Sequence, residues 1–180
     1  MKINFYPDHD DPNFEKAAKK YAEIWNQEGN RIIRVLEKIS GLKFKEEIIN
    51  AITYNENSYS IPLRLQSNST KREKKWTIVH ELCHRLFVAN NIKLNNLTWD
   101  NHNLETHKPV DLILYDVLVE LYGEKEAKDN IKYEIDLWTG KNVSPYKIAW
   151  DWALSMTKEE RAKEFRKYFE FRLTRRAKRV

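Results

Sequence analysis

The 180-residue chain has a single cysteine, only four glycines and five prolines, and no long hydrophobic run. One cysteine excludes an internal disulfide. No apolar stretch reaches the roughly 20 residues that a membrane-spanning helix needs, and residues 1–11 lack the apolar centre of a secretory signal peptide. We therefore expect a cytoplasmic protein with no membrane partner.

The composition is that of a globular chain, with 41% hydrophobic and 33% charged residues. The net charge of +5 is concentrated at one end, because residues 156–180 hold ten Lys or Arg against four Asp or Glu. The last basic residues could contact nucleic acid; they are Arg172, Arg175, Arg176, Lys178 and Arg179. A solvated helix end, where basic side chains are favoured, explains them more simply. Nucleic acid is therefore the less favoured partner.

One pentapeptide carries most of the functional information, His80-Glu81-Leu82-Cys83-His84. On a helix, two histidines four residues apart lie on one face, so both imidazoles can reach a single Zn²⁺. Glu81 lies beside them, where it can accept a proton from a metal-bound water. The flanking residues are apolar at helical spacing, and burying these polar groups without a partner would be costly. A surface helix whose polar side chains merely face water is the alternative.

The segment from Thr77 to Leu86 resembles the active-site helix of zincin metallopeptidases. Thr77, three residues before the first histidine, and the uncharged Leu82 and Cys83 fit that pattern, whereas Arg85 departs from its preference for an uncharged residue. A wider likeness to small bacterial and phage HExxH proteins of minimal gluzincin type covers residues 1–123. The resemblance implies a metallopeptidase with one Zn²⁺ per chain, Glu81 as general base, and a peptide or protein substrate.

The third metal ligand is expected from residues 101–123. Phe87 and Asn90 stand where the metzincin pattern needs Gly and His, so that subclass is excluded. We predict His107 as the ligand, near the start of a helix that begins around Pro109. Asp111, one turn further, is expected beside the metal ligand or as an alternative ligand. The remaining candidates are Glu105, followed by Glu120 and His102.

The pattern of apolar residues predicts an α+β fold that is mainly helical. A long helix over Asn13–Ile39 precedes two strands, Glu47–Tyr54 and Ser58–Leu65, which we expect to form a small antiparallel sheet. Pro62 makes the second an edge strand, which in zincins holds an extended peptide substrate. The motif helix, capped by Ser69 or Thr70, and further helices follow. We expect a zincin-like domain over residues 1–156 and a basic helix over residues 157–180, packed on the same domain.

Three functions remain open on the sequence alone. The first is a zinc-dependent peptidase in which Glu81 activates water. The second is a metal-stabilised regulatory or binding protein without turnover, which would use its basic C-terminal helix. The third is a metal-free helical protein in which the pentapeptide is a coincidence.

Overall fold

The computed structural model describes residues 1–92, 98, 101–140 and 142–177, with backbone alone over 169–177, and divides into two compact units, Met1–Asn90 and Asn91–Val180. The first unit contains β1 (Lys2–Pro7), α1 (Pro12–Ser40), β2 (Ile48–Tyr54), β3 (Leu63–Gln66) and α2 (Lys71–Ala89). The division at Asn90 differs from the boundary expected at residue 156, and the packing of residues 1–156 as one domain stays a prediction.

The sheet has the order β1-β2-β3, and both strand pairs are parallel. The prediction of an antiparallel sheet was therefore wrong. The prediction did not include β1. This strand pairs with β2 in parallel because α1 returns the chain to the same end of the sheet. The alternation of Ile3 and Phe5 with polar neighbours was the signal for β1 in the sequence.

The second predicted strand starts later than expected, because residues 60–62 form a turn. Only Leu63–Gln66 joins the sheet, and Tyr59 pairs with Arg64 through an isolated antiparallel bridge. The long connection lets β3 run in the same direction as β2. β3 nevertheless lies at the edge of the sheet, as the sequence predicted.

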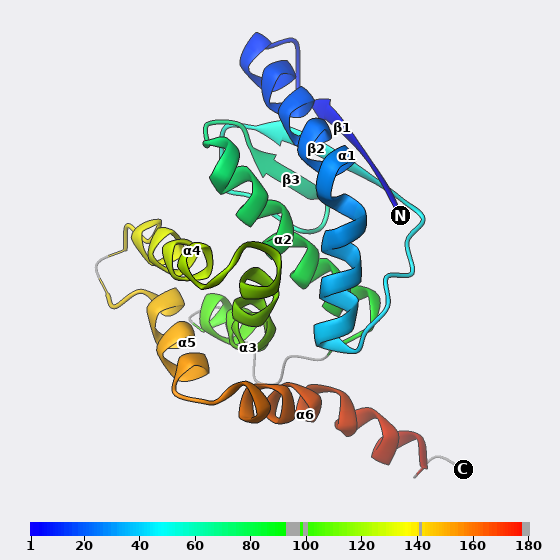
Figure 1. Ribbon diagram of the computed structural model, residues 1–180, viewed down its shortest axis with the longest axis vertical. Coiled ribbons are helices and arrows are strands. Elements are labelled where there is room, and N and C mark those ends of the chain that lie inside the picture. Colours follow the sequence, from blue (N-terminus) through cyan, green and yellow to red (C-terminus); the bar gives the residue numbers. More distant parts are fainter. Residues whose placement is uncertain (93–97, 99–100, 141, 178–180) are drawn as a thin grey trace. The chain divides into compact units, whose positions relative to one another are not determined.

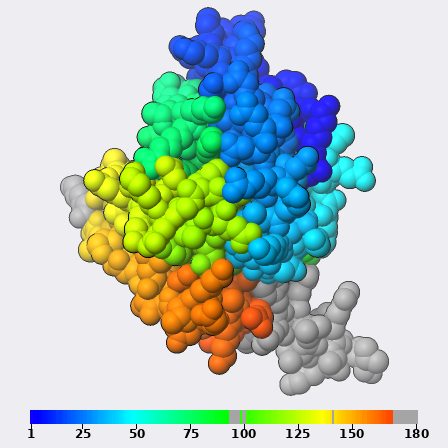
Figure 2. All heavy atoms as spheres, viewed as in Figure 1, coloured from blue at the N-terminus to red at the C-terminus, as the bar shows by residue number. Residues whose placement is uncertain are grey.

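Two helices cover one face of this sheet, α1 against β1 and β2, and α2 against β3 (Figure 1). Figure 2 shows the atoms of α1, in blue, directly against those of α2, in green. α1 is one uninterrupted helix, in agreement with the long helix predicted over Asn13–Ile39. Gly29 gives room to the indole of Trp25, since a Cβ there would lie 2.7 Å from the ring. The helix ends at Ser40, and Gly41 caps it with a φ of 72°.

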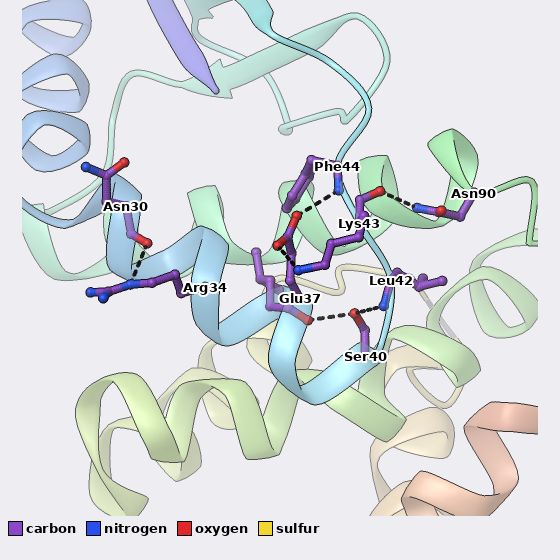
Figure 3. Close-up of polar contacts among 9 residues, drawn as sticks. Asn30, Arg34, Glu37, Ser40, Leu42, Lys43, Phe44 and Asn90 are labelled. Carbon is purple, nitrogen blue, oxygen red and sulfur yellow. Dashed lines mark hydrogen bonds and ion pairs between the residues drawn. The ribbon is translucent and has the colours of Figure 1, made fainter.

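The segment after α1 is tied to both helices by polar contacts (Figure 3). The Glu37 carboxylate accepts from Lys43 Nζ at 2.6 Å and from the Phe44 N–H at 3.0 Å. Asn90, which caps α2, donates through Nδ2 to the Lys43 carbonyl at 2.9 Å and to the Leu86 carbonyl at 2.8 Å. These contacts fix the C-terminal end of the motif helix relative to α1.

The regular elements in the described part of the second unit are all helices: α3 (His102–Tyr122), α4 (Glu124–Asp136), α5 (Pro145–Leu154) and α6 (Lys158–Ala177). α3 begins at His102, so Pro109 lies inside the helix rather than in its first turn. The buried Asp116 of α3 holds Arg161 of α6 in a two-pronged ion pair, with N–O distances of 2.8 and 3.2 Å. This ion pair explains why the largely apolar helix α3 carries an acidic residue at position 116. None of the helices in the described part of the chain is both long and apolar enough to cross a membrane.

Candidate metal centre

The motif helix begins at a well-formed cap. The Thr70 side chain accepts from the Glu73 N–H, and the Glu73 carboxylate accepts in return from the Thr70 N–H at 2.7 Å. Such a capping box satisfies backbone donors that have no partner within the helix. The start of the helix, and hence the rotation of its polar side chains about the axis, is set by this cap. Thr70, one of the two caps predicted, is confirmed.

A buried lysine secures the loop that leads into the helix. The Lys74 ammonium donates to the Ser67 carbonyl at 2.6 Å, and to the carbonyl and hydroxyl of Ser69 at 2.7 and 3.0 Å. Burial lowers the pKa of Lys74 below its usual value. The ammonium lies 5.1 Å from the ring centroid of Tyr21, whose hydroxyl donates to the Gln66 carbonyl. These contacts join the end of β3 to the motif helix.

The two motif histidines converge as the sequence predicted. His80 Nε2 and His84 Nε2 lie 3.1 Å apart, and the ring centroids are separated by 4.9 Å. Two nitrogens at about 2.05 Å from one tetrahedral zinc ion would lie about 3.3 Å apart. The pair therefore has the spacing of two ligands to one ion.

Glu81 lies on the same helix, and only 7% of its surface is exposed. The intervening Leu82 and Cys83 are completely buried and face the core. The pKa of Tyr54, at the end of β2, is raised to about 12, chiefly by burial.

Arg85, which departs from the zincin pattern, has a defined role in the first unit. Its guanidinium binds the Glu46 carboxylate, with Nε to Oε2 at 2.9 Å and Nη2 to Oε1 at 2.5 Å. Its Nη1 donates to the Ser60 carbonyl at 2.7 Å. The positively charged Arg85, directly after the second histidine, therefore holds the neighbouring loops that carry Glu46 and Ser60.

The predicted third ligand, His107, lies in the second unit, in the second turn of α3. It is buried, its Nδ1 is 2.6 Å from the Asn103 carbonyl, and its ring packs edge-on against Tyr146 with centroids 4.5 Å apart. A proton on Nδ1 satisfies that carbonyl and places the lone pair on Nε2. Metal-binding histidines are commonly oriented in this way. His107 as the third ligand stays a prediction.

Asp111 follows His107 by one helical turn and is completely buried. Among the described residues, neither of its carboxylate oxygens has a hydrogen-bond partner. Burial, and then the nearby charge of Glu134, raise the pKa of Asp111 well above 3.8. Because an unpaired buried carboxyl is costly, Asp111 is a strong candidate for a functional role within the second unit.

The other candidate residues show ordinary surface or packing roles. Glu105 pairs with Lys108 at 2.6 Å, and His102 and Glu120 are exposed. The predicted basic residues at the C-terminus, from Arg172 to Arg179, have side chains outside the described part of the chain. Sequence reasoning missed Tyr54, whose position depends on the missed parallel topology. It also missed Lys74, because the charged neighbours Glu73 and Lys75 give no sign of burial.

The geometry of the first unit therefore gives two converging imidazoles beside a buried carboxylate. Comparison of the chain with protein-family models, curated proteins and solved structures found no match.

Proposed function

We propose that the protein is a zinc-dependent peptidase that hydrolyses peptide bonds, with His80 and His84 as zinc ligands and Glu81 as general base. The observation that carries the proposal is the 3.1 Å separation of the two Nε2 atoms, on the helix that also carries the buried Glu81. Imidazole nitrogen is a preferred zinc donor, and this spacing suits two corners of a tetrahedron.

Bound zinc would act as a Lewis acid, which lowers the pKa of a coordinated water and polarises the scissile carbonyl. Glu81 would accept the proton of the attacking water and deliver it to the leaving amine. His107 is proposed as the third ligand from its sequence position and from the orientation of its ring, with Asp111 supporting it.

Metal analysis tests the ligands. We expect about one zinc per chain after dialysis against metal-free buffer. His80→Ala and His84→Ala should lose this zinc, whereas His9→Ala, which removes an exposed histidine of the same unit, should retain it. Wild-type protein with clearly less than one zinc would contradict the metal site.

Hydrolysis tests the general base. Glu81→Gln should retain zinc but lose at least about a hundredfold in the cleavage rate of denatured casein, since general-base catalysis contributes roughly 10²–10⁴-fold. Cleavage at the wild-type rate would remove Glu81 from the mechanism. Zinc binding without any hydrolysis by wild-type protein would favour a metal-stabilised regulatory protein instead.

A further inference from the structure

The edge strand β3 is already paired on its outer side by the chain itself. The N–H and carbonyl of Arg64 bond to Tyr59 at 2.8 and 2.9 Å, and the Gln66 N–H donates to Ser58 Oγ at 3.0 Å. An extended peptide cannot add to β3 at these positions unless residues 58–62, here named the edge turn, move away. The outermost surface beside β3 is therefore the edge turn.

The edge turn is fastened to the motif helix. Arg85 donates from Nη1 to the Ser60 carbonyl at 2.7 Å while Glu46 holds the rest of its guanidinium. The Arg85 side chain is only 14% exposed, so this contact is shielded from water. Arg85 directly follows His84 and shares a helix face with Glu81, four residues earlier. The edge turn is thereby held on the side of α2 that carries Glu81.

The tyrosine at the end of β2 holds the segment that leads into the edge turn. The Tyr54 hydroxyl donates to the Asn57 carbonyl, just before the edge turn. The contact from Arg85 to Ser60 therefore places the edge turn beside the motif helix, and the Tyr54 contact fixes the segment before it.

The edge turn presents two large apolar side chains to solvent. Tyr59 is 55% exposed and Ile61 is 53% exposed. Turns usually carry small or polar residues at such positions, because exposed apolar area gains nothing in the folded chain. Two exposed apolar side chains on a turn whose backbone is held by hydrogen bonds to Arg64 and Arg85 are suited to contacting an apolar side chain of a ligand.

We propose that Tyr59 and Ile61 determine specificity by contacting an apolar side chain of an extended peptide substrate, and that Arg85 is the positioning residue that holds them. This inference rests on the proposed peptidase function. The ligand is a peptide rather than a lipid or nucleic acid because the neighbouring groups are those proposed to hydrolyse an amide. A contact between apolar side chains does not require a basic side chain from the protein.

The first test measures peptide binding without turnover. Full-length Glu81→Gln protein, loaded with zinc, is applied to an array of synthetic octapeptides in which each position is varied among Ala, Asp, Lys, Leu and Phe. We expect a preference for Leu or Phe at one position. Tyr59→Ala combined with Ile61→Ala should weaken binding of the preferred peptides about tenfold, while Tyr59→Phe and Val88→Ala should not; Val88 is an equally exposed apolar residue of α2.

The second test concerns positioning. Arg85→Gln should reduce the preference for Leu or Phe over Asp severalfold with unchanged zinc content. Arg85→Lys should keep more of this preference than Arg85→Gln but less than the wild-type protein, because lysine lacks the planar fork of the guanidinium. In wild-type background, the double alanine variant should raise KM for a preferred peptide about tenfold with kcat changed less than twofold. A structural defect would lower kcat and zinc content instead.

The outcomes separate the inference from the proposed function. An array without apolar preference, or a preference that survives loss of Tyr59 and Ile61, overturns the inference even if wild-type protein hydrolyses casein. A preference that depends on both residues, in a protein that hydrolyses nothing, upholds the peptide contact and overturns the peptidase.

Discussion

At the scale of single residues, the chain keeps two groups in costly surroundings. Lys74 is buried but satisfied by three oxygen acceptors, so its burial is compatible with stability. Asp111 is buried with no hydrogen-bond partner among the described residues. Such a carboxyl lowers stability, and chains retain groups of this kind chiefly where function needs them.

Asp111→Asn should stabilise the zinc-free protein increasingly as the pH rises. The pKa of Asp111 is raised in the folded state, mainly by burial and then by the charge of Glu134. Its contribution to stability is therefore most favourable below the unfolded value of 3.8 and declines as the pH rises toward the folded pKa. Urea unfolding in the presence of a chelator should show a larger advantage of the variant at pH 7 than at pH 4.

A surface acid of the same unit provides the control for that experiment. Asp151→Asn removes an exposed partner of Lys147 and should change the free energy of unfolding by less than about 0.5 kcal/mol at either pH. If wild-type protein were instead the more stable form at pH 7, Asp111 would have a compensating partner and would not carry the expected cost.

At the scale of elements, local signals predicted α1 and α2 well, but they misplaced the start of α3 and the direction of the strands. The C-terminal end of α1 follows from the backbone conformation of Gly41, and the start of α2 follows from the hydrogen bonds of Thr70. Both signals act within a few residues of the chain. Strand direction depends instead on pairing between distant segments. Without β1, the sequence offered two strands and a short polar connection, which is the pattern of an antiparallel hairpin.

The metal centre shows the same division between local and distant relationships. The convergence of His80 and His84 follows from helical spacing alone, and the structure confirms it. The contact from Arg85 to Ser60 could not be predicted, because it joins residues 25 positions apart through a turn that the sequence does not define. For the same reason the third ligand was predicted only from residue type and helix position.

The helices α3 and α6 are joined by a buried ion pair whose loss should be costly. Asp116→Ala should lower the free energy of unfolding by about 3 kcal/mol, because it leaves the Arg161 guanidinium buried without its carboxylate. Arg161 also donates to the Met156 carbonyl at 2.7 Å, which holds the charge in place. Urea unfolding measures the loss, and Asp129→Ala, in an exposed pair with Lys125, is the control.

The double variant of this ion pair separates charge from packing. Asp116→Ala combined with Arg161→Met should recover part of the stability, since no unpaired buried charge remains. A single Asp116→Ala variant with wild-type stability would show that the pair contributes nothing to the docking of α6 on α3.

At the scale of the whole molecule, the two compact units divide the candidate chemistry between them. The histidine pair and Glu81 lie in Met1–Asn90, and His107 and Asp111 lie in Asn91–Val180. Both units contain buried tryptophans, Trp25 and Trp76 in the first and Trp150 in the second. Fluorescence of single-tryptophan variants can therefore follow the unfolding of each unit separately.

Zinc should stabilise the first unit directly, because a ligand that binds only the folded state shifts unfolding by mass action. At a free zinc concentration of one hundred times Kd, the expected gain is about 2.7 kcal/mol. If His107 is the third ligand, as the sequence predicts, zinc should also shift the unfolding transition of the second unit, which the Trp150 fluorescence reports. His107→Ala should abolish that second shift. His102→Ala, which removes an exposed histidine of the same helix, should leave it intact. A second unit indifferent to zinc in wild-type protein would exclude His107 and direct the search for the third ligand to the first unit.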